Sequence, residues 1–351
     1  MTRASSQSPP WTSRARLAVL GTGTALPGPP LSSEDLIELV HRRFAVDVRH
    51  EARAVARRMA IASRHICRDF AARHEAARPG QGNADLAAGA VAVALAAAGL
   101  NVSDVGYLIG HTTTPEQPLP SNIAYVADRL GYAGPHVELR QACTGFANAL
   151  MIATGLLAAP GAKPVVIVGS ETGSLFFDPG RMAQDRGQIV NMMQMGDGAG
   201  AVVLGPAPQA GAMLEAIWFG SIGLGRRPGI QQLSGRQEFD HDFAGILKSG
   251  RELFDADVAA ASALGFPVEA AHFLIPHQVS GRVRLQAASH LGVSQERVFV
   301  NADRIGNTGS AAIWLALADL RASGLETGAR VLALGAEASK YLYGGFAYVH
   351  G

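Results

Sequence analysis

Cysteine is the side chain best suited to nucleophilic chemistry in this sequence, and the chain contains only two. Cys143 follows a strand-like "HVELRQA" and precedes a helix-like "TGFANALMIATGLL". A thiol at a helix N-terminus lies at the positive end of the helix dipole, which lowers its pKa and favours the thiolate. We therefore interpret Cys143 as a nucleophile. The alternative is an inert core residue, because free cysteines are commonly buried. Cys67, in the basic "SRHICRDF", lacks this setting and is expected to be structural.

Two further residues have types that would complement a thiol. His277 follows the apolar "FLIP", in a loop at the carboxyl end of a predicted strand, where α/β sites commonly lie. Asn307, in "RIGNTGSAA", lies where a helix is expected to start. Asn is a favoured N-cap, but its amide can also donate a hydrogen bond to a thioester oxygen that gains negative charge. His277 is one of eleven histidines, so a packing role is the alternative for that residue.

An internal repeat relates these residues to one another. His111 and His277 each follow an apolar run, and Cys143 and Asn307 each precede Thr-Gly, with nearly the same spacing along the chain in both pairs. The runs "VVIVGSE" and "VLALGAE" are separated by the same interval as the two histidines. Apolar strand-like runs alternate with alanine-rich helical stretches, which indicates an α/β protein with a buried sheet. Repetition of strand and helix units is common in that class, so the alternative to a duplication is coincidence.

The repeat predicts how the chain is organised. We expect a disordered arm over 1–14, a first half over 15–207 that carries the nucleophile, and a second half over 208–351 that carries His277 and Asn307. Equivalent loops of two such halves can converge on one central site. His111, the counterpart of His277, is followed by "TTTPEQP" and is expected to be structural or to line the site.

The composition excludes several classes of function. With 351 residues, 48% hydrophobic content and a net charge of +1, the chain can bury a large core and has no overall attraction for nucleic acid or anionic membrane. Two cysteines fit a reducing compartment, and the first residues lack the apolar core of a secretory signal, so we expect a cytoplasmic protein. No stretch is long and apolar enough to span a bilayer. No metal motif is present, and Pro27 in "GTGTALPG" argues against dinucleotide binding.

From about Leu17 onwards the sequence resembles the β-ketoacyl-acyl carrier protein synthase III family of the thiolase superfamily. The resemblance is carried by "VLGTGTALPG", "ACTGF", "MGDGAGAVVL", "IPHQVSGR" and "RIGNTGSAA", in that order. It implies an α/β, thiolase-like, five-layered α-β-α-β-α fold made of two duplicated halves, usually as a homodimer. It also implies acyl transfer to a cysteine, followed by decarboxylative Claisen condensation with a malonyl thioester.

The resemblance implies roles for individual residues. Cys143 would be acylated, and His277 and Asn307 would stabilise the enolate formed when CO₂ leaves. Backbone N–H groups of Cys143, Gly344 and Gly345 would form the oxyanion hole. A further residue, Arg282, lies where the family has a basic residue for docking the acyl carrier protein. The partners would be acyl carrier protein and coenzyme A thioesters as substrates, with no separate cofactor.

Some segments depart from the family pattern and predict a specialised pathway. The stretch "EARAVARRMAIASRHI" lacks the family's tryptophan for the adenine of coenzyme A, and Met59-Ala60 replaces Thr-Gly. Coenzyme A would then bind differently, or the donor would be a carrier protein. The Arg-rich stretch 49–78 would dock an acidic carrier, although a solvated helix face is the simpler interpretation. Leu119 replaces an aromatic residue of the acyl pocket, which would admit a longer or branched chain, and "GAEASKYLYGGF" replaces a more glycine-rich ending.

Two other functions are compatible with the same resemblance. The first is an acyltransferase that passes the acyl group from Cys143 to an alcohol or amine, with His277 as general base. Asn307 favours condensation over this alternative. The second is a non-catalytic partner subunit of a heterodimeric synthase, which the presence of Cys143, His277 and Asn307 together disfavours.

Overall fold

Two sheets, one from each half of the chain, join where β2 pairs with β9 and so form one ten-stranded order, β12-β13-β14-β9-β2-β8-β7-β5-β6, with β1 paired to β9. The computed structural model describes residues 8–72, 74–207, 211–233, 235 and 237–351. The strands of this sheet are β1 (Trp11–Ser13), β2 (Leu17–Ala25), β5 (Tyr107–His111), β6 (His136–Leu139), β7 (Val165–Thr172), β8 (Asp197–Pro206), β9 (Met213–Ser221), β12 (Phe273–Pro276), β13 (Arg330–Glu337) and β14 (Leu342–Val349). The central strands are covered on both faces, which explains their continuous apolar runs.

The same strand order occurs in each half of the chain. In the first half β2 is antiparallel to β8 and β8 to β7, while β7 is parallel to β5 and β5 to β6. In the second half β9 is antiparallel to β14 and β14 to β13, while β13 is parallel to β12. A single parallel bridge, Leu274 to Val298, takes the place of β6. The two halves meet where Leu17 and Ala18 of β2 pair with Leu214 and Met213 of β9. The boundary at 207/208 itself stays a prediction.

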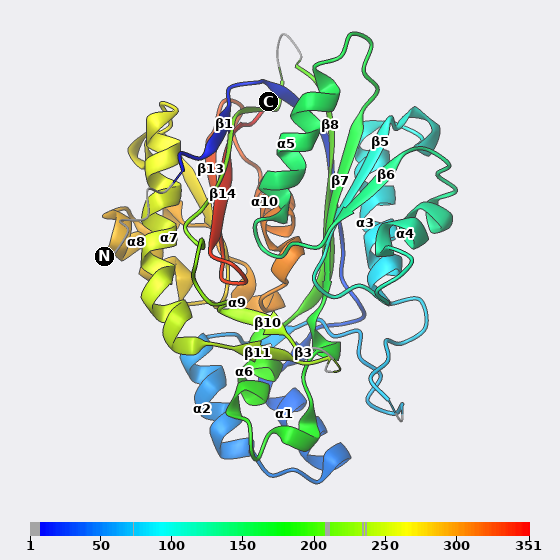
Figure 1. Cartoon of the computed structure of the whole chain (residues 1–351), viewed down its shortest axis with the longest axis vertical. Coiled ribbons are helices and arrows are strands. Elements are labelled where there is room, and N and C mark those ends of the chain that lie inside the picture. Colours follow the sequence, from blue (N-terminus) through cyan, green and yellow to red (C-terminus); the bar gives the residue numbers. More distant parts are fainter. Residues whose placement is uncertain (1–7, 73, 208–210, 234, 236) are drawn as a thin grey trace.

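Helices cover both outer faces of the sheets and fill the space between them (Figure 1). The helices are α1 (Ser33–Phe44), α2 (Arg49–Met59), α3 (Asn83–Ala98), α4 (Asn122–Leu130), α5 (Gly145–Leu157), α6 (Arg186–Gln194), α7 (Phe243–Ala263), α8 (Val283–Leu291), α9 (Ala302–Ile305) and α10 (Ala312–Ala322). α5 and α10 lie between the two sheets, α3 and α4 cover the first half, and α7 and α8 cover the second. This is the expected five-layered α-β-α-β-α arrangement.

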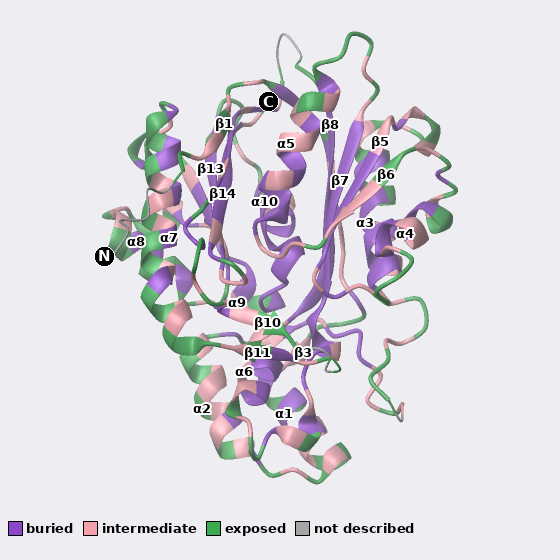
Figure 2. Ribbon diagram, in the orientation of Figure 1, coloured by how far each residue is buried: buried purple, intermediate pink, exposed green. Residues whose placement is uncertain are grey.

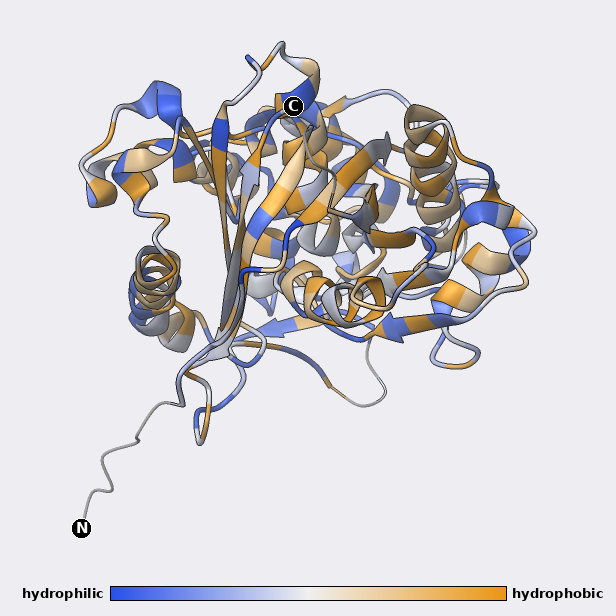
Figure 3. Cartoon of the chain, turned by 90° about the horizontal axis from the view of Figure 1, so that it is seen from above, coloured by the Kyte–Doolittle hydropathy of each residue, from blue (hydrophilic) through white to orange (hydrophobic). Residues whose placement is uncertain are grey.

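The central helices consist mainly of apolar and small residues because strands enclose these helices. In α5, most residues of the first three turns are buried (Figure 2). The rings of Phe146 from α5, Trp314 from α10 and Phe346 from β14 pack against one another with centroids 5.7 to 5.9 Å apart. Seen from above, several strands and helices of the layered body carry runs of hydrophobic residues (Figure 3). None of the helices among the described residues has both the length and the apolar character needed to cross a membrane.

A helical lobe built from α1, α2 and α6 lies at one end of the layered body (Figure 1). It has its own core, and two short hairpins lie nearby: β3 (Leu31–Ser32) with β4 (Ser63–Arg64), and β10 (Ile230–Gln232) with β11 (Phe239–His241). In α2 only Ala52 is fully buried, and Arg49 and Arg53 form ion pairs with acidic neighbours. This part of the Arg-rich stretch is therefore largely a solvated helix face.

The arm expected over 1–14 is shorter than the sequence indicates. Trp11–Ser13 forms β1, which pairs antiparallel with β9 through Trp11 to Phe219. Trp11 also packs against the main hydrophobic core. Residues 1–7 lie outside the described part of the chain, so the prediction of disorder there is untested.

Candidate active site

Cys143 lies in the turn between β6 and α5, just before the helix begins. The residue is partly exposed. The next residue, Thr144, is the N-cap of α5, and its backbone N–H and hydroxyl both donate to Glu337 Oε2, at 3.0 and 2.7 Å. A Cβ at Gly145 would lie 2.5 Å from His111 Nδ1, so only glycine lets the first turn of α5 pack on that ring. The turn is thus fixed from both sides.

The electrostatic setting of Cys143 differs from the one expected at a helix N-terminus. Burial raises the pKa of the Cys143 thiol well above its usual value, and the charges of Glu337 and Glu171 raise it further. These effects outweigh the helix dipole that was expected to lower it. The thiol is therefore neutral near neutral pH, and it must lose its proton in any reaction in which the sulfur is the nucleophile.

His277 follows β12 directly, and its backbone N–H donates to Leu334 O of β13 at 2.7 Å. Burial lowers the pKa of His277 to about 4, so the imidazole is neutral near neutral pH. Its Nδ1 is buried without a hydrogen-bond partner among the described residues. A neutral imidazole in this position can donate or accept a hydrogen bond without carrying a positive charge.

His111 has the structural role expected of the counterpart of His277. It is 1% exposed, and its Nε2 accepts a hydrogen bond from Trp314 Nε1 at 3.2 Å. Burial lowers the pKa of His111 to about 3. The neutral His111 ring therefore packs against the first turn of α5 and so supports the turn that carries Cys143.

Asn307 is held by both its backbone and its side chain. Its backbone N–H donates to Gln194 O at 2.8 Å, and its carbonyl accepts from Gly196 N–H at 3.0 Å. Its Oδ1 accepts from Gly309 N–H at 3.0 Å, which leaves the amide NH₂ as the group available to a substrate. The residue is largely buried. The Oδ1 of Asn307 therefore caps the turn that follows, and the role of its amide NH₂ toward a substrate stays a prediction.

The turns that carry Cys143 and Asn307 are in direct contact. The hydroxyl oxygen of Ser310, which closely follows Asn307, lies 3.3 Å from the carbonyl oxygen of Gln141, which closely precedes Cys143, while its hydrogen is donated over the shorter distance of 2.7 Å to Glu171. The two turns come from opposite halves of the chain, as the repeat predicts. His277 lies at the carboxyl end of β12, beside β13, whose last residue Glu337 binds Thr144. The cysteine and asparagine turns are thus in contact, and the histidine follows the strand that runs parallel to β13, toward the end of β13 that contacts the cysteine turn.

The assignment of Gly344 and Gly345 to the oxyanion hole does not agree with the structure. Both residues are buried inside β14, which is paired with β13 on one edge and β9 on the other. Backbone N–H groups of a strand paired on both edges are used in the ladder. Glycine is needed there for packing, because a Cβ at Gly344 would lie 2.8 Å from Ala147 Cβ and one at Gly345 would lie 2.4 Å from the Trp218 ring.

Arg282 and Leu119 lie at the surface. Arg282 donates to the carbonyls of Arg58 and Arg57 at the end of α2, at 2.7 and 3.2 Å, and so ties the histidine loop to the helical lobe. Its role in docking a carrier protein stays a prediction. Leu119 is 84% exposed in the single chain, so it closes no cavity there, and its place in an acyl pocket likewise stays a prediction.

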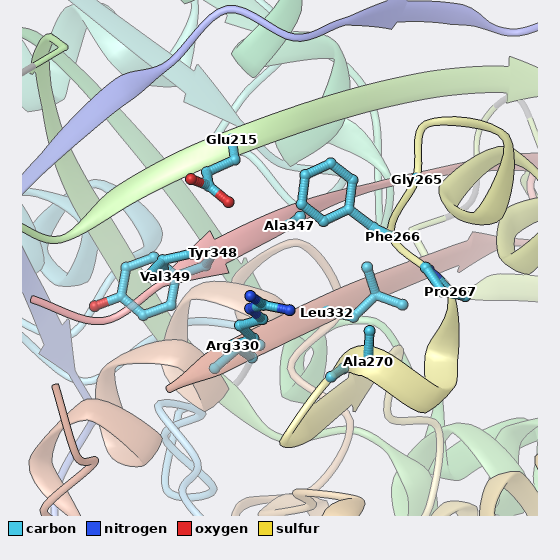
Figure 4. A pocket seen from close by; sticks show the side chains of 12 residues that line it. Glu215, Gly265, Phe266, Pro267, Ala270, Arg330, Leu332, Ala347, Tyr348 and Val349 are labelled. Carbon is cyan, nitrogen blue, oxygen red and sulfur yellow. The ribbon is translucent and has the colours of Figure 1, made fainter. Parts of the chain in front are cut away.

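A separate small cavity of about 220 Å³ lies away from these residues (Figure 4). Glu215, Phe266, Arg330 and Tyr348 are among the residues that line it. Arg330 begins β13, whereas Glu337, which ends β13, contacts the cysteine turn. This cavity is therefore at the opposite end of the strand from the candidate active site.

Comparison with known proteins identifies the family. Models for the 3-oxoacyl-[acyl-carrier-protein (ACP)] synthase III and its C-terminal region match residues 137–222 and 262–344. A β-ketoacyl-[acyl-carrier-protein] synthase III from Neisseria gonorrhoeae is 31% identical over 340 residues, which cover 94% of this chain and 96% of that protein. The chain belongs to the β-ketoacyl-acyl carrier protein synthase III family.

Solved structures agree with this membership. AbyA1, a tetronic acid condensing enzyme, is 28% identical, with a TM-score of 0.81 over 95% of this chain and 99% of that one. The priming β-ketosynthase of the R1128 polyketide pathway is 25% identical, with a TM-score of 0.79 over 99% of this chain and 98% of that one. The thiolase-like α/β fold predicted for this synthase is confirmed, and the protein is a condensing acyltransferase of the synthase III type.

Inspection of the sequence missed two site residues of this synthase, Glu171 and Glu337. They end the repeated runs "VVIVGSE" and "VLALGAE", so the repeat itself contained the signal. The structural role expected of Cys67 is supported by full burial and by a hydrogen bond from its backbone N–H to Asp197 Oδ2 at 2.6 Å. Burial also raises the pKa of this second thiol.

Proposed function

We propose that this synthase condenses an acyl group held on Cys143 with a malonyl thioester. The observation that carries the proposal is the contact between the Cys143 and Asn307 turns through Ser310 and Gln141. This contact supports a site that combines a nucleophile with an amide donor, and the neutral His277 at the end of the neighbouring strand supports its inclusion. A thiol with two neutral donors suits thioester chemistry in which negative charge develops on oxygen.

In the first step the Cys143 sulfur attacks the carbonyl of an acyl thioester. The new S–C bond forms as the bond to the donor thiol breaks, and the cysteine proton leaves with that thiol. In the second step the malonyl group loses CO₂, and hydrogen bonds from His277 and Asn307 stabilise the enolate oxygen. The enolate carbon attacks the acyl carbonyl, a C–C bond forms, and the sulfur is released and protonated again.

The oxyanion formed on the acyl group needs donors other than Gly344 and Gly345. We assign one to the backbone N–H of Cys143. We assign the second donor to a backbone N–H of the turn 338–341. This turn directly follows Glu337, which is hydrogen-bonded to Thr144, the residue after Cys143. The N–H groups of a turn, unlike those of β14, are not committed to a strand ladder on both sides.

The proposed partners are an acyl carrier protein for the malonyl group, and either a carrier protein or coenzyme A for the acyl donor. Exposed Arg57, Arg58 and Arg282 at the end of α2 support an acidic carrier at this edge. A homodimer is supported by β6, which within the described part of the chain is paired only with β5 and so leaves one strand edge open. The other end strand, β12, is partly covered by the bridge to Val298. Light scattering in solution tests the dimer.

A specialised pathway is supported by the missing tryptophan, by Leu119 and by the likeness to AbyA1.

The decisive experiment incubates the enzyme with acyl thioesters and a malonyl carrier protein labelled in its free carboxyl group. We expect an adduct on Cys143 by intact-protein mass, then labelled CO₂ and a β-ketoacyl product. Acylation of Cys143 without CO₂ from any malonyl donor would contradict condensation. An ester or amide formed with a hydroxylated or amino acceptor would establish the acyltransferase alternative. If the wild-type protein shows no acyl adduct beyond what Cys143→Ala also shows, the chain would instead be a non-catalytic subunit.

A further inference from the structure

Each catalytic turn is held by a glutamate from the opposite half of the chain. Glu337, the last residue of β13 in the second half, accepts two hydrogen bonds from Thr144 in the first half, at 3.0 Å from the backbone N–H and 2.7 Å from the hydroxyl. Thr144 is bonded directly to Cys143. Any movement of this carboxylate is therefore transmitted to the sulfur through one peptide unit.

Glu171 makes the reciprocal contact. It lies in β7 of the first half, and its Oε2 accepts from the Ser310 backbone N–H at 2.9 Å and from the Ser310 hydroxyl at 2.7 Å. Gly309 has φ +48, and a Cβ there would lie 2.5 Å from Glu171 Oε2. The Gly309 N–H donates to Asn307 Oδ1 at 3.0 Å. A continuous series of contacts thus connects Glu171 to the orientation of the Asn307 amide.

Both carboxylates are built into the interior. Glu171 is 1% exposed and Glu337 is 2% exposed. The second oxygen of Glu171 accepts from the Thr113 backbone N–H at 3.1 Å and from the Thr114 hydroxyl at 2.6 Å, and that of Glu337 accepts from the Ser339 hydroxyl. Burial of a charge is costly unless it is fully hydrogen-bonded, so a buried acid with these partners needs a reason beyond packing.

We propose that Glu337 and Glu171 are crossed positioning residues, Glu337 setting the Cys143 thiol for acylation and Glu171 setting the Asn307 amide for decarboxylation. The assignment of the two chemical steps depends on the proposed function. The placement of the carboxylates does not, because it follows from hydrogen bonds between the two halves. The two glutamates end the equivalent runs "VVIVGSE" and "VLALGAE", so the crossing follows the internal repeat.

The charge of these groups gives a test that needs no substrate. After burial, Glu337 is the largest cause of the raised pKa of Cys143, and Glu171 is the next. The other titratable groups around the turn are His111, which lies under Gly145, and His277, which arrives from β12. Both imidazoles are neutral near neutral pH because burial lowers their pKa values to about 3 and about 4. The two carboxylates are therefore the charges that the thiol experiences.

The first experiment measures the rate of alkylation of Cys143 by iodoacetamide as a function of pH. Glu337→Gln keeps an oxygen that can accept from Thr144 but removes the charge, and Glu171→Gln does the same beside Ser310. The exposed Glu326→Gln is the matched control, and Cys143→Ala gives the background from the buried Cys67. The midpoint is the pH at which the alkylation rate reaches half of its maximum. We expect this midpoint to fall by about 1 pH unit or more in Glu337→Gln, by less in Glu171→Gln, and not in the control. An unchanged midpoint in a Glu337→Gln protein of unchanged melting temperature overturns the proposal.

The second experiment separates the two steps. Glu337→Ala and Glu171→Ala are assayed for adduct formation on Cys143 and, after acylation, for CO₂ release from malonyl carrier protein. We expect Glu337→Ala to slow adduct formation by about tenfold or more relative to CO₂ release, and Glu171→Ala to do the converse. Thr144→Val and Ser310→Ala, which each remove one hydroxyl, replace these variants if they do not fold. Equal loss in both steps for both variants overturns the assignment. Absence of CO₂ from the wild-type enzyme would reject the proposed function and leave the alkylation test to decide on the carboxylates.

Discussion

At the scale of single residues, the site combines neutral donors with a protonated thiol. Cys143 was expected to be a thiolate because of its helix, but burial and two nearby carboxylates raise its pKa instead. His277 and His111 are both held neutral by burial, which lowers their pKa values. The resting site therefore holds its charge on Glu171 and Glu337 rather than on the groups that would meet the substrate. A thiol with a raised pKa is a small fraction thiolate near neutral pH, so it reacts more slowly with other electrophiles than an activated cysteine does.

The neutral state of His277 predicts a pH-dependent stability. Its pKa is about 4 in the folded protein and 6.5 in the reference state, so the unfolded chain binds more protons between these values. The free energy of unfolding should therefore decrease as the pH is lowered from about 6.5 to about 4, with about 3 kcal/mol of the decrease due to His277. Urea denaturation across this range measures it. His277→Gln should show a shallower dependence, and an identical slope in this variant would contradict the prediction.

At the scale of elements, the end of α2 contains a strained residue. Ala60 caps the helix with φ 52, and its N–H donates to Ala56 O at 2.9 Å. Glycine occupies this left-handed conformation without a steric cost, and the family resemblance places Gly at this position. We expect Ala60→Gly to stabilise the protein by about 0.5 to 1 kcal/mol in urea denaturation. The control Ala54→Gly, exposed within the same helix, should destabilise by about 1 kcal/mol. Destabilisation by Ala60→Gly would show that the strain is absent.

The element scale also shows what the sequence could and could not predict. Periodicity and the repeat predicted the buried strands, the central helices and the meeting of the Cys143 and Asn307 turns, because each depends on local pattern and on symmetry. The assignment of Gly344 and Gly345 to the oxyanion hole failed because a sequence with two adjacent glycines is compatible both with a turn and with a closely packed strand. The raised pKa of Cys143 comes first from burial and then from the charges of Glu337 and Glu171, which lie in other elements, so the residues next to Cys143 in sequence could not indicate it.

At the scale of the whole molecule, the two halves are joined through one strand. β9 pairs with β14 of its own half and with β2 and β1 of the other, so the seam between the halves lies along its edge. β1 extends this seam from Trp11 opposite Phe219 to Ser13 opposite Ile217. Residues 11–13 therefore contribute to the contact between the halves, although they lie in a stretch whose composition resembles that of a disordered arm.

This seam predicts the effect of truncating the N-terminus. Deletion of residues 1–14 removes β1 together with Trp11, which packs against the main core, and exposes one edge of β9. We expect a loss of about 1 to 3 kcal/mol in the free energy of unfolding, because a partly buried tryptophan and a set of ladder hydrogen bonds disappear. Deletion of residues 1–7 is the matched control and should leave stability unchanged. Thermal and urea denaturation of both variants measure the difference. If the two deletions behave alike, β1 does not stabilise the junction, and the contact through β2 holds the halves together without it.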